Sequence, residues 1–436
     1  MKKRFVFFFV AFCFVFFCEK TDAANANASA DEKLIVHEWG TFTSLQDEDG
    51  NAIGGINTDD EPVPDFVHNL APLLLIPASK FDVRGKGLTP GCNPDVTMRL
   101  ETPVMYFHTQ NRADANGAKN ENIDVKVDFR GGWLTQFFPD ANATAPGISK
   151  NHFAALTQQT IGGLEWLGLE LNAPDAVQKM PKTDAHVWTT PRAVSAAMVK
   201  NPANGESEKF LFYRGVGHLD APLRVQRERD ELLLFANSDF EMQTPRAWLV
   251  DIRGDGSAAF RALPQMQLAR AALQPPAAQT PAAFSPENYR VDSLTGLRAQ
   301  MKAALISQGL FDDEAEAMLA TWELSYFKSA GLRLFFIVPE KWTNAVLPLA
   351  LSKPAEIKRV MIGRIELVTP QQRAALAQIA RAPAMFSDAQ SETLHRSYLA
   401  LGRFRNALIL DEQKRHPTEA LANFINRYAL EAYRGE

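Results

Sequence analysis

The sequence predicts an α+β protein, with an N-terminal antiparallel β-rich domain of sandwich-like architecture and a mainly helical C-terminal region. Three observations lead to this prediction. Short apolar runs bounded by turn residues fill residues 31–272. Proline and alanine dominate residues 273–288, as in a linker. From residue 289 to 436, apolar residues mostly recur every three to four positions, which indicates helices with a few strands.

Residues 1–30 have the pattern of a signal peptide. A basic start at residues 2–4 precedes an apolar run at 5–17, and small residues with Ala-x-Ala spacing follow at 24–30. The apolar run is too short to span a bilayer comfortably, so no integral membrane span is expected. We expect a periplasmic or secreted protein. Lipid attachment at Cys18 is the weaker alternative, because two phenylalanines precede it.

Composition is that of an ordinary folded protein. The chain has 436 residues and a formal net charge of −5, and no basic run follows the leader, so nothing points to nucleic acid. Removal of the leader would leave Cys92 as the single cysteine, which excludes an intramolecular disulfide.

Strands are expected through the first half of the mature chain. Their predicted ranges are 36–44, 104–108, 123–129, 210–216, 223–227, 232–236, 247–253 and 257–263. Asp255-Gly256 predicts a hairpin between the last two, which explains the Arg-Gly-Asp triplet better than an adhesion motif does. Long irregular stretches at 57–77, 111–121 and 140–147 have the length of functional or disordered loops.

Helices are expected after the linker. Their predicted ranges are 294–306, 312–327, 391–413 and 417–433, with a buried strand at 332–338. A further helix is predicted to begin at Thr369, because a threonine cap, a proline at the first helical position and Gln372 at the third form a start signal.

Several familiar sites are excluded. His37-Glu38 lacks the second histidine of a zincin helix, and no Gly-x-Ser-x-Gly elbow or phosphate-binding Gly-Lys-Ser/Thr loop occurs. Gly215-Val216-Gly217 lacks the third glycine of a dinucleotide site. Asp47-x-Asp49-x-Asn51 fails as an EF-hand, because its glycine is misplaced and Thr58 stands where glutamate is needed.

Histidine and glutamate supply the first candidate site. His37, His108 and His218 lie in the strand-rich half and could hold a divalent transition metal, with Glu38 or Glu101 as a catalytic base or a further ligand. On a regular strand, His37 and Glu38 point to opposite faces, so both could serve one site only across a bulge. The alternative is a half-buried strand whose histidine bonds to backbone.

Arginine and aromatic residues supply the second candidate site. Arg130 lies near Trp133, and Tyr213 precedes Arg214. Arginine forks bind carboxylate, phosphate or sulfate, and aromatic faces bind sugar rings or apolar groups. Trp39 is a further candidate for substrate binding. The alternatives are ion pairs inside the fold for the arginines and a core position for Trp39.

The segments His37-Glu38-Trp39-Gly40-Thr41-Phe42-Thr43-Ser44 and Glu101-Thr102-Pro103-Val104-Met105-Tyr106-Phe107 carry a resemblance. With residues 210–217 and 359–366, they resemble a group of exported bacterial proteins of unknown function. The resemblance spans most of the mature chain. It implies export and implies no particular activity.

Two functions remain open. The first is an extracytoplasmic hydrolase or lyase, metal-assisted in one version, that acts on an anionic or polymeric substrate of the envelope or the extracellular space. It predicts that the candidate side chains converge in one pocket. The second is a non-catalytic extracytoplasmic binding module, favoured by the absence of a complete catalytic motif. The sequence leaves the substrate, the metal and the oligomeric state open.

Overall fold

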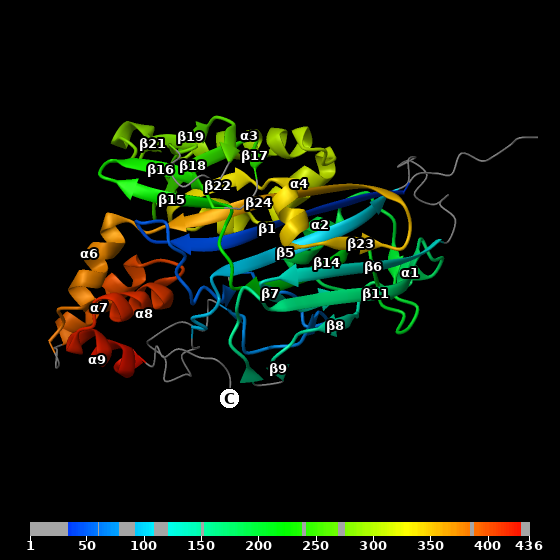
Figure 1. Cartoon of the computed structure of the whole chain (residues 1–436), viewed down its shortest axis with the longest axis horizontal. Helices are drawn as coiled ribbons and strands as arrows, with labels where there is room; N and C mark the ends of the chain where they lie inside the picture. The colour runs from blue at the N-terminus through cyan, green and yellow to red at the C-terminus, as the bar shows by residue number, and fades with distance from the viewer. Residues whose placement is uncertain are drawn as a thin grey trace, which may run out of the picture. The chain divides into compact units, whose positions relative to one another are not determined.

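A mixed sheet of 15 strands organises the structure (Figure 1). The computed structural model describes residues 34–59, 61–77, 92–108, 121–149, 152–237, 241–268, 275–383 and 388–428. The predicted signal peptide and Cys18 lie outside these residues. Strands come first and most helices follow, so the prediction of an α+β fold is confirmed.

The main path of the sheet runs through eleven strands. In order they are β13 (Ser207–Glu208), β12 (Val199–Lys200), β11 (Ile161–Leu171), β7 (Gly132–Phe138), β14 (Leu211–Gly217), β5 (Met98–His108), β1 (Leu34–Gln46), β24 (Ala355–Leu367), β22 (Gly331–Ile337), β18 (Ala247–Ile252) and β19 (Ala258–Leu263). The strands that pair off this path are β3 (His68–Asn69), β6 (Glu121–Arg130), β8 (Asn142–Thr144) and β23 (Leu349–Leu351).

Smaller sheets and the helices surround this sheet. The small sheets are β15 (Leu223–Glu228) with β16 (Glu231–Ala236) and β21 (Ala278–Pro281), β17 (Met242–Thr244) with β20 (Met266–Leu268), β9 (Ile148–Ser149) with β10 (His152–Phe153), and β2 (Thr58–Asp59) with β4 (Ile76–Pro77). The helices are α1 (Ala176–Lys179), α2 (His186–Arg192), η3 (Pro286–Asn288), α3 (Ser293–Ser307), α4 (Asp312–Thr321), the π-helical η4 (Leu324–Lys328), α5 (Glu340–Val346), α6 (Pro370–Ile379), α7 (Asp388–Ala400), α8 (Arg405–Arg415) and α9 (Glu419–Tyr428). No described helix has the length and apolar character needed to cross a membrane.

Strand β1 lies at the centre of the sheet. It pairs parallel with β24 over its whole length and antiparallel with β5 from Ile35 to Ser44. A register shift between Trp39 and Thr41 marks a bulge opposite β5. Almost every residue of β1 is buried, as expected for a strand covered on both faces.

The C-terminal region shares this sheet with the N-terminal one. β24 and β22 come from the segment predicted as mainly helical, yet β24 pairs with β1 and β22 pairs with β18. The chain from Lys33 to Glu436 is one compact unit. Part of the predicted linker forms β21, which pairs with β16. The predicted boundary therefore does not separate two compact units.

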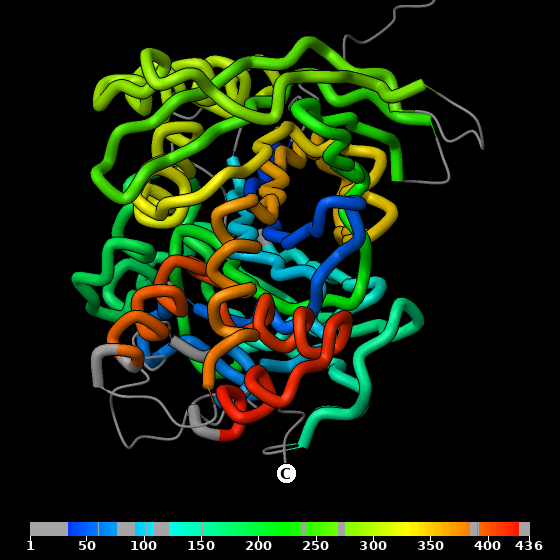
Figure 2. Tube along the Cα trace, turned by 90° about the vertical axis from the view of Figure 1, so that its left-hand side faces the viewer, coloured from blue at the N-terminus to red at the C-terminus, as the bar shows by residue number. Residues whose placement is uncertain are grey.

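Side chains on the central strands alternate between two faces. Along β1, Val36 and Phe42 enter the largest apolar core. Trp39 points the other way, into a second core that includes residues of α3 and α4. Leu45, also on that second face, joins a third core formed with α6 to α9. The orange and red helices α6–α9 gather away from the yellow-green α3 in both views (Figures 1 and 2). Two helical groups thus cover different ends of one sheet face.

Two local predictions are confirmed in detail. Thr369 accepts a hydrogen bond from the Gln372 backbone N–H at 3.2 Å, and the Gln372 side chain accepts one from the Thr369 N–H at 2.9 Å, so α6 begins with a capping box. Asp255-Gly256 lies at the turn between β18 and β19, where Gly256 has a φ of 83°.

Two predicted helices are interrupted. The helix predicted at 391–413 divides into α7 and α8, because Gly402 takes a left-handed conformation with φ 78°. The helix predicted at 312–327 ends at Thr321, and the chain continues as the π-helical η4. Both interruptions matter for the site, since Arg403 and Ser325 lie just beyond them.

Candidate functional site

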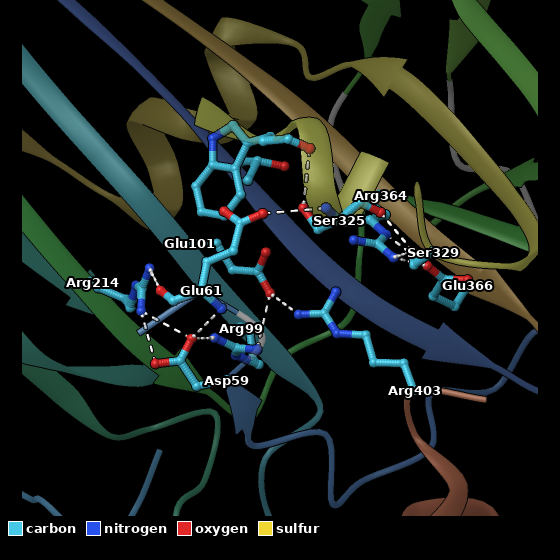
Figure 3. A network of polar contacts seen from close by, with 12 residues as sticks. Asp59, Glu61, Arg99, Glu101, Arg214, Ser325, Ser329, Arg364, Glu366 and Arg403 are labelled. Atoms are coloured by element: carbon cyan, nitrogen blue, oxygen red, sulfur yellow. Dashed lines mark hydrogen bonds and ion pairs between the residues drawn. The ribbon is translucent and has the colours of Figure 1, made fainter. Parts of the chain in front are cut away.

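Four adjacent strands, β14, β5, β1 and β24, hold the segments on which the sequence resemblance rests. Between the two helical groups, their common face carries charged side chains in place of apolar ones (Figure 3). We call this set the arginine–carboxylate cluster. Its members are Asp59, Glu61, Arg99, Glu101, Arg214, Arg333, Arg364, Glu366 and Arg403.

Asp59 connects two arginines of neighbouring strands. Nη1 of Arg214 donates to both carboxylate oxygens of Asp59 at 3.1 Å, and Nη2 of Arg99 lies 3.5 Å from Oδ1. Nη2 of Arg214 also donates to the backbone carbonyl of Glu61 at 3.1 Å. These bonds fix the segment after β2 against the sheet.

Glu101 is held as a carboxylate. Nη2 of Arg403 donates to Oε1 of Glu101 at 2.9 Å, and Nη1 of Arg99 lies 3.2 Å from the same oxygen. Burial alone would raise the pKa of Glu101, but the charges of Arg403 and Arg99 outweigh it and lower this pKa to about 2.

Glu61 has the opposite environment. Its Oε1 accepts a hydrogen bond from the Ser325 backbone N–H at 3.2 Å, while Oε2 has no hydrogen-bond partner among the described residues. Burial, and then the negative charge of Glu101, raise the pKa of Glu61 to about 7. The residue as a whole is half-buried, and Oε2 itself is buried. Figure 3 shows Glu61 beside Glu101 and directed toward Ser325.

Glu366 closes the other side of the cluster. Nε of Arg364 donates to Oε1 of Glu366 at 2.6 Å, and Nε of Arg333 lies 3.3 Å from that oxygen. Burial lowers the pKa of Arg333 to about 10. A cavity of about 20 Å³ adjoins Arg333, Arg364, Glu366 and Arg403, which is room for roughly one water molecule.

Some guanidinium donors in the cluster have no acceptor. Nε of Arg99 and Nη1 of Arg364 are buried without a hydrogen-bond partner among the described residues. Nη1 of Arg99 has an ion-pair distance to Glu101 but lacks hydrogen-bond geometry. Buried donors of this kind are costly unless an acceptor satisfies them, and an anionic group satisfies several at once.

A second cluster lies on the same face, nearer the start of β1. Nδ1 of His37 lies 2.7 Å from Oε2 of Glu314, and Nε2 of His108 lies 2.8 Å from Oε1. Burial would raise the pKa of Glu314, but hydrogen bonds from His108 and His37 lower it to about 2. We call these three residues the His–Glu cluster.

Glu38 and Tyr213 lie on the opposite face. Nε and Nη2 of Arg359 donate to the two oxygens of Glu38 at 2.8 and 3.0 Å, and the Tyr213 hydroxyl donates to Oε1 at 2.5 Å. All three side chains are buried. Arg359 and Tyr213 thus satisfy the Glu38 carboxylate within the fold. Glu38 points away from the face of His37 because side chains alternate along β1.

The remaining candidates are separate. Trp39 lies in the second core, and Trp133 lies in the third core and donates from Nε1 to the Pro146 carbonyl. His218 bonds through Nδ1 to the carbonyl of Asp95 at 2.7 Å, and Arg130 is exposed. The structure therefore brings His37 together with His108, and Glu101 near Arg214, but does not gather all the candidates in one pocket.

Several site residues were missed from the sequence. Asp59 and Glu61 lie in the loop 57–77, whose length alone suggested a function. Arg403 follows Gly402, and that glycine could have predicted a break in the helix at this point. Glu314 carried no signal, because its partners on β1 and β5 are more than 200 positions away.

Comparisons with known proteins add little. No family model and no curated protein matches the chain. Among solved structures, the Fcho1 Mu homology domain of Danio rerio with bound Eps15 peptide covers 78% of this chain and 96% of its own, at 7% identity and a TM-score of 0.26. A similarity this low carries no argument about fold or function.

Proposed function

We propose that the protein is an exported hydrolase or lyase whose catalytic centre is the arginine–carboxylate cluster. The observation that carries this proposal is the contrast between two neighbouring carboxyl groups. Glu101 is paired with two arginines, whereas Glu61 has one buried carboxylate oxygen without a hydrogen-bond partner among the described residues. Export rests on the signal-peptide pattern of residues 1–30.

Glu61 is the proposed general base. A base is most effective when its pKa lies near the working pH, and the pKa of Glu61 is raised to about 7. Glu101, with a pKa lowered to about 2, stays ionised and keeps the pKa of Glu61 high. Pairs of carboxyls whose environments drive their pKa values apart are typical of acid–base sites.

The arginines are the proposed binding groups for the substrate. Arg99 and Arg364 offer buried donors that have no acceptor in the part of the chain that the structure describes, and guanidinium groups bind carboxylate, phosphate and sulfate in a directed way. We therefore propose an anionic substrate. A metal is not needed for this role.

The test is an activity screen of the purified exported protein. Chromogenic phosphate, sulfate and uronide esters report hydrolysis, and polyuronates report β-elimination through the ultraviolet absorbance of the unsaturated product. For a substrate that is turned over, Glu61→Gln should lower kcat by about 100-fold or more. Arg99→Lys should raise KM about tenfold, since lysine keeps the charge and loses the fork. Glu165→Gln on β11 is the matched control and should leave both unchanged.

The pH dependence gives a sharper outcome. Because Glu61 must be ionised to act as a base, kcat/KM should rise through about pH 7, and this limb should be absent from any residual activity of Glu61→Gln. Turnover that Glu61→Gln leaves intact would contradict the proposal. Anion binding without turnover of any substrate would favour the non-catalytic binding module instead.

A further inference from the structure

The His–Glu cluster joins three elements that are far apart in the chain. His37 lies on β1, His108 on β5 and Glu314 in the first turn of α4. The relative exposures of these residues are 3%, 2% and 0%. We propose that this cluster binds one divalent transition metal ion, of which Zn²⁺ is the best match, and that the ion fastens α4 to the sheet.

The ligand chemistry fits this ion. Two imidazole nitrogens and a carboxylate form a three-ligand set that zinc uses in proteins, where water takes the fourth position. Facing nitrogen and oxygen atoms of the three residues all lie within 4.8 Å of one another. In a tetrahedral site with metal–ligand bonds of about 2.1 Å, the ligand atoms are roughly 3.4 Å from one another. The histidine nitrogens now lie 2.7 and 2.8 Å from the Glu314 oxygens, so each of these distances needs to increase by only several tenths of an ångström to admit the ion.

Surrounding groups hold the ligands in place. The ring of Phe311 packs on both histidines, with centroid distances of 4.5 Å to His37 and 5.1 Å to His108. The Phe311 backbone N–H donates to Oε2 of Glu314 at 2.8 Å, which orients the carboxylate. Supporting hydrogen bonds of this kind are typical around metal ligands.

The proposed metal site is separate from the arginine–carboxylate cluster. Glu101 of β5 lies opposite Thr41 in the strand pairing with β1, and Thr41 is four residues after His37. At about 3.3 Å per strand residue, the two positions are roughly 13 Å apart along β1. A metal at His37 is thus too distant to activate a water beside Glu101, and its loss should affect stability more directly than chemistry.

The test uses the full exported chain, stripped with a chelator and then titrated with Co²⁺ and Zn²⁺. We expect one equivalent of Co²⁺ with the strong visible absorption of a tetrahedral ion, and a higher Tm in the presence of Zn²⁺. Glu314→Gln should weaken binding at least tenfold. His218→Asn is the matched control, because His218 bonds to the Asp95 carbonyl elsewhere, and it should bind like the wild type.

Two results would overturn the proposal. One is a stripped wild-type protein whose Tm and visible spectrum do not change with either ion, a result that does not depend on whether any variant folds. The other is equal weakening of binding in Glu314→Gln and His218→Asn. The hydrolase or lyase assignment would survive both results, since it depends on Glu61.

Discussion

At the scale of single residues, Glu61 and Glu101 of the arginine–carboxylate cluster differ in their surroundings and not in residue type. Glu101 and Arg214 could be nominated from the sequence, because charged residues within strands are uncommon and both lie in recognisable segments. Glu61 could not. Its raised pKa depends on burial and on Glu101, and its carboxylate accepts a hydrogen bond from Ser325, 264 positions away.

The pairing of Glu101 predicts acid sensitivity. Its pKa is about 2 in the folded protein and near 4.5 when unfolded, so its stabilising contribution is complete above about pH 4.5 and is lost as the pH falls toward 2. At about 1.4 kcal/mol for each pKa unit, that contribution is roughly 3 kcal/mol. Urea unfolding at several pH values should show Glu101→Gln destabilised near neutrality and less sensitive to acid than the wild type.

Glu165→Gln controls for the loss of a glutamate charge and should unfold with the pH dependence of the wild type. Glu314 also has a lowered pKa, so some acid sensitivity should remain in Glu101→Gln. An unchanged pH dependence in Glu101→Gln would show that Arg403 and Arg99 do not hold this carboxylate.

At the scale of elements, helix ends bring chemistry into the site. Predicting helices from apolar spacing gave the correct regions but joined α7 to α8 and α4 to η4. The apolar spacing continues across both interruptions, so periodicity could not reveal them. Gly402 could have revealed the first, since glycine commonly ends helices in a left-handed conformation.

Gly402→Ala tests this turn. An alanine there meets no atom closer than 3.8 Å, so the cost is that of the left-handed backbone, about 1–2 kcal/mol. Gly205→Ala is a matched control, because Gly205 has a φ of 79° and open space around it. Urea unfolding should show both variants destabilised.

Only Gly402→Ala should also disturb Arg403 and thereby reduce the acid sensitivity that depends on Glu101. Equal pH profiles for the two glycine variants would mean that the turn does not position Arg403.

At the scale of the whole molecule, one sheet contains strands from both the N-terminal and the C-terminal region of the described chain. The succession of strands and helices was predictable, because each type of element has its own local spacing of apolar residues in the sequence. The pairing of β1 with β24 was not, because it joins Leu34 to Ala355 and no local pattern encodes a partner so distant. The same limit applies to the site, whose residues come from β2, the loop after β2, β5, β14, β22, β24 and the turn after α7.

The most direct test of the central claim is the pKa of Glu61. Carboxyl carbon NMR of protein labelled at glutamate, compared with Glu61→Gln for assignment, follows this titration without any substrate. We predict one resonance with a midpoint near pH 7 that is missing in the variant. A Glu61 resonance that titrates near pH 4.5 would contradict the claim, and the cluster would then be a set of ion pairs that only holds the fold together.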